Sequence, residues 1–219
     1  MKTLVIATRN AHKVAEIQAL LLDRCRCVGL AGWGSRVPEA VEDQASFAGN
    51  AVKKALTVAS WLATEVDVLT ELGGASVVGV LADDSGLEVD ALGGAPGVHS
   101  ARFAALDDPS RTGNSPDSDN NAKLLRLLAE VPVDRRTGRF RCALAWIPAV
   151  TSSPASAPRL FEGACEGRIT QAPSGQGGFG YDPLFVPAGQ SLSFAELGSE
   201  LKNQISHRAQ ALRLFRAVF

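Results

Sequence analysis

Short apolar runs alternate with segments of helical periodicity along this chain, and this alternation limits the possible folds more than any other feature of the sequence. Residues 3–7 form an apolar run of strand length. Between residues 14 and 21, apolar side chains recur every three or four positions, which is the period of a helix with one buried face. Asn10 precedes that helix and is suited to cap it. A buried strand followed by a helix is the unit of α/β proteins, so the sequence predicts an α/β fold.

Later segments continue the alternation of strands and helices. The patterns predict helices over residues 46–62, 119–130 and 205–219, and strands over residues 77–82, 140–147 and 160–170. The last two strands are expected to be antiparallel neighbours, joined by a long connection rich in Pro, Ser and Ala. Residues 107–118 consist almost entirely of turn formers and predict an exposed loop.

Composition excludes several classes of protein. The 219 residues carry 22 Lys and Arg against 23 Asp and Glu, so the net charge is −1 and a nonspecific nucleic-acid binder is excluded. This length fits one large domain or two closely joined lobes. No apolar run is long enough to span a membrane or to form a signal peptide, so no membrane partner and a cytoplasmic location are expected. Four cysteines without a C-x-x-C pair predict reduced, mostly buried thiols.

The first predicted strand turns into a helix at residues 8–13, with the sequence TRNAHK. The N–H groups and the positive dipole end at a helix N-terminus favour an anion. Thr8, Asn10 and Lys13 add a hydroxyl, an amide and a cation, so the turn is a candidate phosphate site without a P-loop. The alternative is that Asn10 only caps the helix and that Lys13 is only a solvated helix residue.

Two consecutive carboxylates, Asp83 and Asp84, close the apolar strand predicted at 77–82. Successive strand side chains point to opposite faces, so one carboxylate is expected to face a cleft and the other to turn inward. Carboxylates followed by Ser85 and Gly86 suit a hard divalent cation. The alternative is an ordinary turn rich in Asp and Gly.

A glycine-rich segment at residues 175–183 formally contains the pattern G-x-G-x-x-G. It is not a dinucleotide fingerprint, because that motif needs a following helix and Asp182-Pro183 prevents one. The glycines let the backbone approach a ligand, and an aromatic ring such as Phe179 can stack on a base. The alternative is a tight turn with two core aromatic residues, Phe179 and Tyr181.

Two cations and a histidine, Lys202, His207 and Arg208, lie near the start of the last predicted helix. A solvated, charged helix start is the simpler account of these residues taken alone. Together with the three segments above, they indicate a site for an anionic ligand that carries an aromatic group.

In five segments that follow the family's order, the chain resembles the Ham1-like purine nucleoside triphosphate pyrophosphatases. The segments are TRNAHK, Glu42 before SFAGNA, ADDSGLEVDALGGAPGVHSAR, GGFGYDPLF, and Lys202 before SHRAQAL. The resemblance implies an elongated α/β fold with a long central mixed sheet flanked by helices, two lobes with an active-site cleft between them, and a homodimer. It also implies Mg²⁺-dependent hydrolysis of non-canonical purine nucleoside triphosphates (ITP, dITP and XTP) to the monophosphate and pyrophosphate, which cleanses the nucleotide pool.

Roles for individual residues follow from the same resemblance. Asp84 would be the catalytic base and a metal ligand, and Glu42 would be the second ligand of Mg²⁺. Residues 8–13 would bind the triphosphate, Phe179 would stack on the base, and the cations near the last helix would recognise the purine edge. The implied substrate-binding residues are Thr8, Arg9, Asn10, Ala11, His12, Lys13, Ser85, Phe179, Gly180, Tyr181, Asp182, Lys202, His207 and Arg208.

The chain departs from the family's pattern at Gly49, where members commonly carry a glutamate. Loss of that carboxylate would leave metal binding to Glu42 and Asp84. Residues 67–76 and 107–118 resemble lengthened loops without an assigned role. Two alternatives stay open: a Maf-like nucleotide pyrophosphatase of other specificity, which the GGFGYDP and SHR segments disfavour, and a catalytically silent nucleotide-binding protein, for which Gly49 is the only hint.

Overall fold

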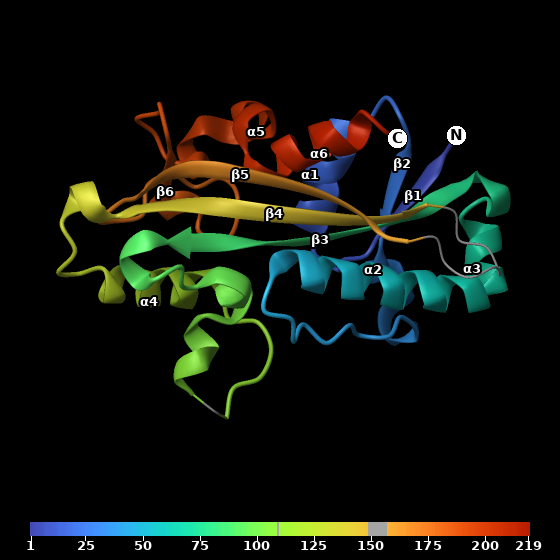
Figure 1. The fold of residues 1–219 in the computed structure, drawn as a ribbon, viewed down its shortest axis with the longest axis horizontal. Helices are drawn as coiled ribbons and strands as arrows, with labels where there is room; N and C mark the ends of the chain where they lie inside the picture. Colours follow the sequence, from blue (N-terminus) through green and yellow to red (C-terminus); the bar gives the residue numbers. More distant parts are fainter. Residues whose placement is uncertain (109, 149–156) are drawn as a thin grey trace. The chain divides into compact units, whose positions relative to one another are not determined.

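A computed structural model of the chain describes residues 1–108, 110–148 and 157–219. Its six-stranded sheet has the order β2-β1-β3-β4-β5-β6 (Figure 1). The strands are β1 (Thr3–Ile6), β2 (Arg26–Gly29), β3 (Val77–Val89), β4 (Thr137–Pro148), β5 (Arg159–Ile169) and β6 (Phe185–Pro187). Strand β1 pairs in parallel with both β2 and β3, whereas β5 and β6 are antiparallel. The sheet is therefore mixed, and the predicted α/β class is confirmed.

Six α-helices accompany the sheet in the described ranges. They are α1 (Ala11–Leu21), α2 (Phe47–Thr64), α3 (Val66–Glu71), α4 (Asp117–Leu127), α5 (Phe194–Ile205) and α6 (His207–Arg216). The chain divides into two compact units. Unit 1 contains Met1–Asp84, Cys142–Glu162 and Ala211–Phe219, and unit 2 contains Ser85–Arg141 and Gly163–Gln210. The first boundary falls inside β3, between Asp84 and Ser85.

The core of unit 1 lies between its strands and the apolar faces of α1 and α6. Ile17 and Leu21 of α1 and Leu212 and Phe215 of α6 are fully or almost fully buried in one cluster with residues of β1, β3 and β4. Helix α2 covers the other face of these strands (Figure 1). Its N-cap is Ser46, whose hydroxyl accepts the N–H of Gly49, so the predicted start is confirmed.

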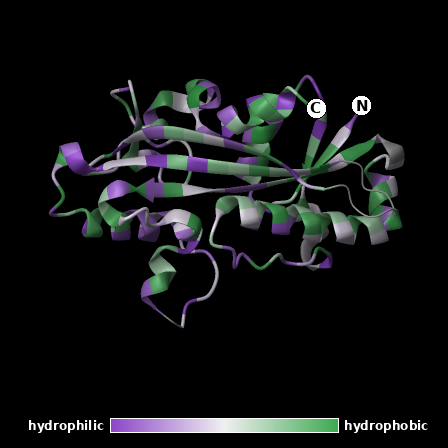
Figure 2. Ribbon diagram, in the orientation of Figure 1, coloured by the Kyte–Doolittle hydropathy of each residue, from purple (hydrophilic) through white to green (hydrophobic). Residues whose placement is uncertain are grey.

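Unit 2 has a separate core, built from Leu87 and Val89 of β3, Leu124 of α4, Phe140 of β4 and Phe194 of α5, among others. Much of α4 is hydrophilic (Figure 2), so only one face of this helix is buried in that cluster.

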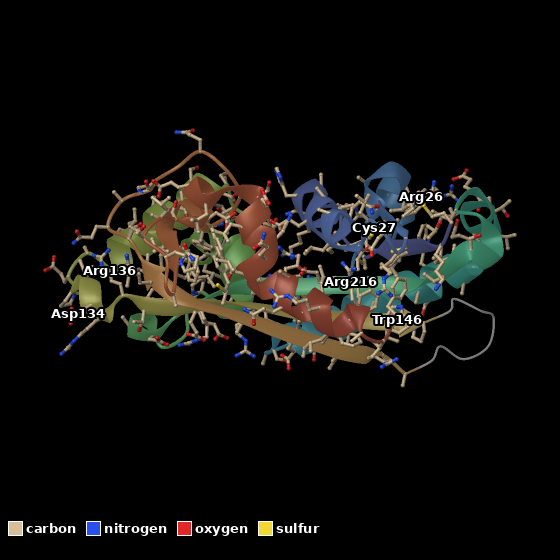
Figure 3. All side chains as sticks on the ribbon, turned by 90° about the horizontal axis from the view of Figure 1, so that it is seen from above. Arg26, Cys27, Asp134, Arg136, Trp146 and Arg216 are labelled. Atoms are coloured by element: carbon tan, nitrogen blue, oxygen red, sulfur yellow. The ribbon has the colours of Figure 1, made fainter. Side chains whose placement is uncertain are left out.

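A buried guanidinium fixes the turn before β4, where Arg136 is only 3% exposed. It donates to the carbonyl oxygens of Leu128, Val131 and Thr170 at 2.6, 3.0 and 3.2 Å. In Figure 3, Arg136 lies at the end of the sheet where β4 begins. The charged side chain thus replaces water as the donor to three carbonyl groups.

Three elements differ from the sequence prediction. Strand β3 does not end at Ala82 but continues through Asp83-Asp84-Ser85-Gly86 to Val89, because β4 continues beside it and this pairing outweighs the turn composition. The predicted helix 205–219 is α6 (His207–Arg216), but the extended residue Ser206 (φ −66°, ψ 160°) separates it from another helix, α5, which the sequence patterns did not predict. Residues 67–76 are not a simple loop but contain most of α3 and a short 3-10 helix.

Other predictions about the chain agree with the structure. Strands β4 and β5 are sheet neighbours as expected, while residues 149–156 of their predicted connection lie outside the described residues. All four cysteines are free, and three of them are buried. Within the described part of the chain, no helix has both the length and the apolar character needed to cross a bilayer.

Candidate active site

The turn at residues 8–13 begins α1 with an Asn10 cap. The side-chain oxygen of Asn10 accepts the N–H groups of His12 and Lys13 at 2.9 and 3.2 Å, and the Thr8 hydroxyl accepts the N–H of Asn10 at 3.1 Å. Asn10 therefore satisfies two of the helix donors that the sequence offered to a phosphate. The turn still offers an anion the positive end of the dipole and the cation of Lys13.

The side chain of Arg9 forms hydrogen bonds within the fold. Its guanidinium donates to the carbonyl oxygens of Gly34 and Val37 at 3.1 and 2.9 Å, so it holds the segment that follows β2. Both bonds are made by the Nη2 atom, so the guanidinium of Arg9 stabilises the conformation of unit 1.

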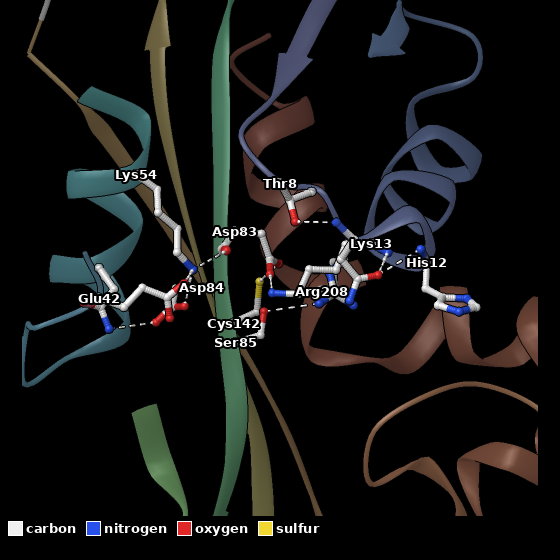
Figure 4. A network of polar contacts seen from close by, with 12 residues as sticks. Thr8, His12, Lys13, Glu42, Lys54, Asp83, Asp84, Ser85, Cys142 and Arg208 are labelled. Carbon is white, nitrogen blue, oxygen red and sulfur yellow. Dashed lines mark hydrogen bonds and ion pairs between the residues drawn. The ribbon is translucent and has the colours of Figure 1, made fainter. Parts of the chain in front are cut away.

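Asp83 lies inside unit 1 with a fully buried side chain. One of its oxygens forms an ion pair with Lys13, and the other accepts the thiol of Cys142 at 3.2 Å (Figure 4). Asp83 is thus the inward-turned carboxylate of the pair, and it fixes the position of the Lys13 ammonium.

Asp84 contacts a different set of residues, all in unit 1. Its oxygens accept Lys54 Nζ at 2.6 Å and Asn50 Nδ2 at 3.2 Å. Lys54 Nζ also lies 2.8 Å from a carboxylate oxygen of Glu42 (Figure 4). The two predicted metal ligands, Glu42 and Asp84, therefore converge on one positive charge, and this charge belongs to a residue that the sequence reading missed.

Burial and charge act against each other in this cluster. Burial raises the pKa of Asp84, and the attraction of Lys54 and Lys13 offsets the rise only in part. Burial would lower the pKa of Lys54, yet Asp84 and Glu42 together raise it above its ordinary value. Lys54 is therefore a firmly protonated cation, and Asp84 is a carboxylate that holds a proton more readily than an exposed one.

Helix periodicity could have identified Lys54. Asn50 and Lys54 are four residues apart in α2, so they lie on the same face of the helix. Asn50 is fully buried, and its side-chain oxygen accepts the N–H of Gln44 at 3.0 Å. A polar pair at this spacing on a largely apolar helix was the available signal.

The residues of unit 1 fit a magnesium ion. Among the described residues, no group of three or more His, Cys, Asp or Glu side chains is arranged to hold a metal by itself. Glu42 and Asp84 supply two carboxylates within reach of one cation. Mg²⁺ prefers oxygen ligands, keeps several waters and commonly takes one or two protein carboxylates together with substrate phosphates, so two carboxylates suffice.

Gly49 occupies the third position of α2. A Cβ atom there would lie 2.9 Å from the Cβ of Gln44, which is closer than real contacts of this kind. A glutamate at position 49 would therefore require the segment around Gln44 to shift.

In unit 2, the glycine-rich segment forms a tight turn around Asp182. One oxygen of Asp182 accepts the N–H of Phe179 at 2.9 Å and Lys202 Nζ at 2.5 Å. Lys202 Nζ lies 4.6 Å from the centre of the Phe179 ring, and the Arg208 guanidinium lies 5.9 Å from it. Phe179 is half-buried, so this turn presents an aromatic ring with two cations close to it. Residues 175–183 are called the aromatic turn below.

Other predicted residues of unit 2 are buried. The Tyr181 ring belongs to the core, and its hydroxyl donates to the carbonyl oxygen of Ser100 at 2.9 Å. His207 stacks on Phe140, with ring centres 4.8 Å apart and planes 13° apart. Burial raises the pKa of Tyr181 above its ordinary value. The structural alternative considered for the aromatic pair thus holds for Tyr181 but not for Phe179.

Arg208 is 1% exposed and donates to the Ser85 hydroxyl at 3.2 Å. The structure therefore brings the predicted residues together in two sets. The set in unit 1 contains Lys13, Glu42 and Asp84, and the set in unit 2 contains Ser85, Phe179, Gly180, Asp182, Lys202 and Arg208. Ala11 and His12 are exposed on α1.

The chain is thus an α/β protein with a carboxylate and lysine cluster in one unit and a cation-backed aromatic turn in the other. The sequence model of the Ham1 family matches residues 4–218, nearly the whole chain. This chain belongs to the Ham1 family.

Named relatives and solved structures agree with this membership. The chain is 47% identical over 210 residues to the dITP/XTP pyrophosphatase of Desulforamulus reducens, covering 96% of this chain and 92% of that one. It is 45% identical over 212 residues to the protein of that name from Geobacillus kaustophilus, covering 97% and 91%. The structure of a HAM1 protein from Coxiella burnetii superposes with a TM-score of 0.77 at 34% identity, covering 100% of this chain and 98% of that one. The Staphylococcus aureus Ham1 protein gives a TM-score of 0.75 at 32% identity, covering 99% and 97%.

Proposed function

We propose that this chain hydrolyses non-canonical purine nucleoside triphosphates such as ITP, dITP and XTP to the nucleoside monophosphate and pyrophosphate. The observation that carries the proposal is the convergence of Glu42 and Asp84 on the Lys54 ammonium, because it joins two carboxylates and a fixed cation in one small cluster. Relatives named dITP/XTP pyrophosphatase at 40–47% identity support the substrate class.

Unit 1 would act on the triphosphate. Lys13, held by Asp83, and Lys54 would bind phosphate oxygens, and the start of α1 would add its dipole. Asp84 would orient the attacking water and accept its proton at a carboxylate oxygen. The raised pKa of Asp84 suits a group that must take up a proton during the reaction.

Glu42 and Asp84 would hold Mg²⁺. When bound, the ion would neutralise charge on the departing pyrophosphate. Hydrolysis of the α–β phosphoanhydride would release the two terminal phosphates together. The fit rests on the carboxylate pair, because oxygen ligands of this kind suit Mg²⁺.

Unit 2 would bind the nucleoside. Phe179 would stack on the purine, with Lys202 and Arg208 behind its ring. The backbone of residues 179–182 would approach the nucleoside. A 6-oxo purine presents an acceptor where adenine presents a donor. Hydrogen-bond donors of the protein that face position 6 of the purine would therefore discriminate against ATP.

Two further proposals concern the whole protein. We propose that it works in the cytoplasm, where nucleoside triphosphates are abundant, and that it forms a homodimer. Sedimentation at micromolar concentration tests the dimer, and a mass near that of one chain would refute it.

The reaction is tested by product analysis with purified protein, Mg²⁺ and ITP. The proposal predicts IMP and pyrophosphate in equal amounts. The pyrophosphate should be detected directly, without an added inorganic pyrophosphatase. Formation of IDP and orthophosphate would refute the reaction type. Binding of ITP without any product would instead favour the catalytically silent alternative.

A further inference from the structure

One residue of the aromatic turn is held through both polar groups of its backbone. The N–H of Gly180 donates to a carboxylate oxygen of Asp117 at 2.6 Å, and the carbonyl of Gly180 accepts Asn121 Nδ2 at 3.0 Å. Asp117 and Asn121 are four residues apart at the start of α4, so one face of this helix holds the turn. All three residues belong to unit 2.

Asn121 is not arranged for greatest stability. It is 9% exposed, and its side-chain oxygen is buried without a hydrogen-bond partner among the described residues. Its amide orientation is fixed, because only the nitrogen can donate to the carbonyl of Gly180. A buried acceptor without a donor destabilises the fold, so stability alone does not explain an asparagine at this position.

The neighbouring Asn120 provides a contrast. Its oxygen accepts the N–H of Ala104 at 2.8 Å, and its nitrogen reaches the carbonyl oxygens of Ala101 and Ser115 at 3.3 and 3.4 Å. Both polar atoms of Asn120 are used within the fold. Asn120 is thus a structural amide, whereas the side chain of Asn121, among the residues that the structure describes, donates only to the aromatic turn.

Gly180 lies between the two aromatic residues of the turn. Its φ of +64° is a left-handed conformation that favours glycine. On one side Tyr181 is fixed by its hydrogen bond to Ser100, and on the other side Phe179 is only half-buried. Rotation of the Gly180 peptides would therefore move the Phe179 ring more than the Tyr181 ring.

We propose that Asn121 and Asp117 are positioning residues for nucleoside binding, which set the Phe179 ring by holding both polar groups of Gly180. This inference rests on the proposed function of the aromatic turn. It assigns a role to the first turns of α4, which the helical pattern of the sequence does not reveal.

The test is the pair of variants Asn121→Leu and Asp117→Ala, measured for thermal stability and for steady-state pyrophosphate release from ITP. Leucine has the same branch point and the same number of side-chain heavy atoms as asparagine, although it is larger, and it removes the buried acceptor together with the donor. We expect Asn121→Leu to keep or raise the melting temperature, to raise KM by about 2- to 10-fold, the effect of one lost hydrogen bond, and to leave kcat nearly unchanged. Asp117→Ala should also raise KM, and Asp117→Asn, which retains an acceptor, should restore it in large part.

Asp119→Ala is the matched control. Asp119 is an exposed carboxylate in the same first turn of α4, paired at 3.3 Å with Arg111 instead of with the aromatic turn. A rise in KM for this control equal to that of Asp117→Ala would overturn the proposal, because the effect would then come from helix charge. An Asn121→Leu variant with a lower melting temperature and an unchanged KM would also overturn it, since Asn121 would then be merely structural.

The wild-type protein separates this inference from the proposed function. If wild type releases no pyrophosphate from ITP, the proposed reaction fails, and the dissociation constant of ITP measured by calorimetry replaces KM in the same comparison. If wild type is active and both variants bind ITP as wild type does, the positioning role fails while the reaction stands.

Discussion

Replacement of Lys54 by methionine tests the charge balance of the carboxylate cluster. Lys54 Nζ lies 2.6 Å from Asp84 and 2.8 Å from Glu42, and its side chain is 14% exposed. Opposite charges about 3 Å apart attract by about 5 kcal/mol at an effective dielectric constant near 20, and burial offsets part of this attraction. Removal of one partner from a buried ion pair costs about 3–5 kcal/mol. Because Glu42 is one-third exposed, we expect Lys54→Met to lower the free energy of unfolding by about 3 kcal/mol.

The assay is urea denaturation at neutral pH, without and with Mg²⁺. The neighbouring Lys53 provides a matched control, because it is 36% exposed and pairs with the exposed Asp43. Lys53→Met should lower the free energy of unfolding by less than about 1 kcal/mol. Mg²⁺ should restore part of the stability lost in Lys54→Met, since a bound cation balances the same carboxylates. Equal losses for the two variants would refute the reasoning that Lys54 carries the charge balance of this cluster.

Three further predictions concern single residues. Asp84→Asn should reduce pyrophosphate release by at least about 100-fold while circular dichroism shows an intact fold, and residual activity near that of wild type would exclude Asp84 as the base. Tyr181 is the only tyrosine, and burial raises its pKa, so absorbance at 295 nm should show no ionisation near pH 10 in the folded protein. Since the unfolded chain ionises first, the free energy of unfolding should decrease as pH rises above about 10, and a tyrosine titrating normally in folded protein would contradict the burial. Arg136→Met should lower the free energy of unfolding by about 3–5 kcal/mol in denaturant titrations, because three carbonyl groups lose a charged donor; a loss below 1 kcal/mol would contradict that role.

Local patterns predicted the starts of the first two long helices. Asn10 caps α1 as expected, and α2 starts after Ser46, where the pattern placed its beginning, because a helix start depends mainly on the next few residues. The alternation of strands and helices also gave the fold class, since each apolar face must be buried against another element.

Long-range pairing decided what local patterns could not. Asp83-Asp84-Ser85-Gly86 has the composition of a turn, but β3 runs on beyond the end of its pairing with β1 at Leu81, because β4 continues beside it. Helix α5 was also missed, whereas α6 lies within the helix predicted over residues 205–219.

The candidate site was predictable where the residue type was itself unusual. Consecutive aspartates and a glycine-rich aromatic turn stand out in the sequence, and both lie in polar clusters of the structure. Asn121 does not stand out, because an asparagine on a helix is ordinary, and Lys54 is marked only by its spacing from Asn50 on a largely apolar helix. Only the contacts with Asp84 and Gly180 reveal what they hold.

The central claim is selectivity for non-canonical purine triphosphates, and the ratio of kcat/KM values for ITP, dITP, XTP, GTP and ATP, measured as pyrophosphate release with Mg²⁺, tests it most directly. The account predicts that ITP, dITP and XTP are preferred over ATP and GTP by at least about 100-fold. Equal kcat/KM values for all five triphosphates would contradict it.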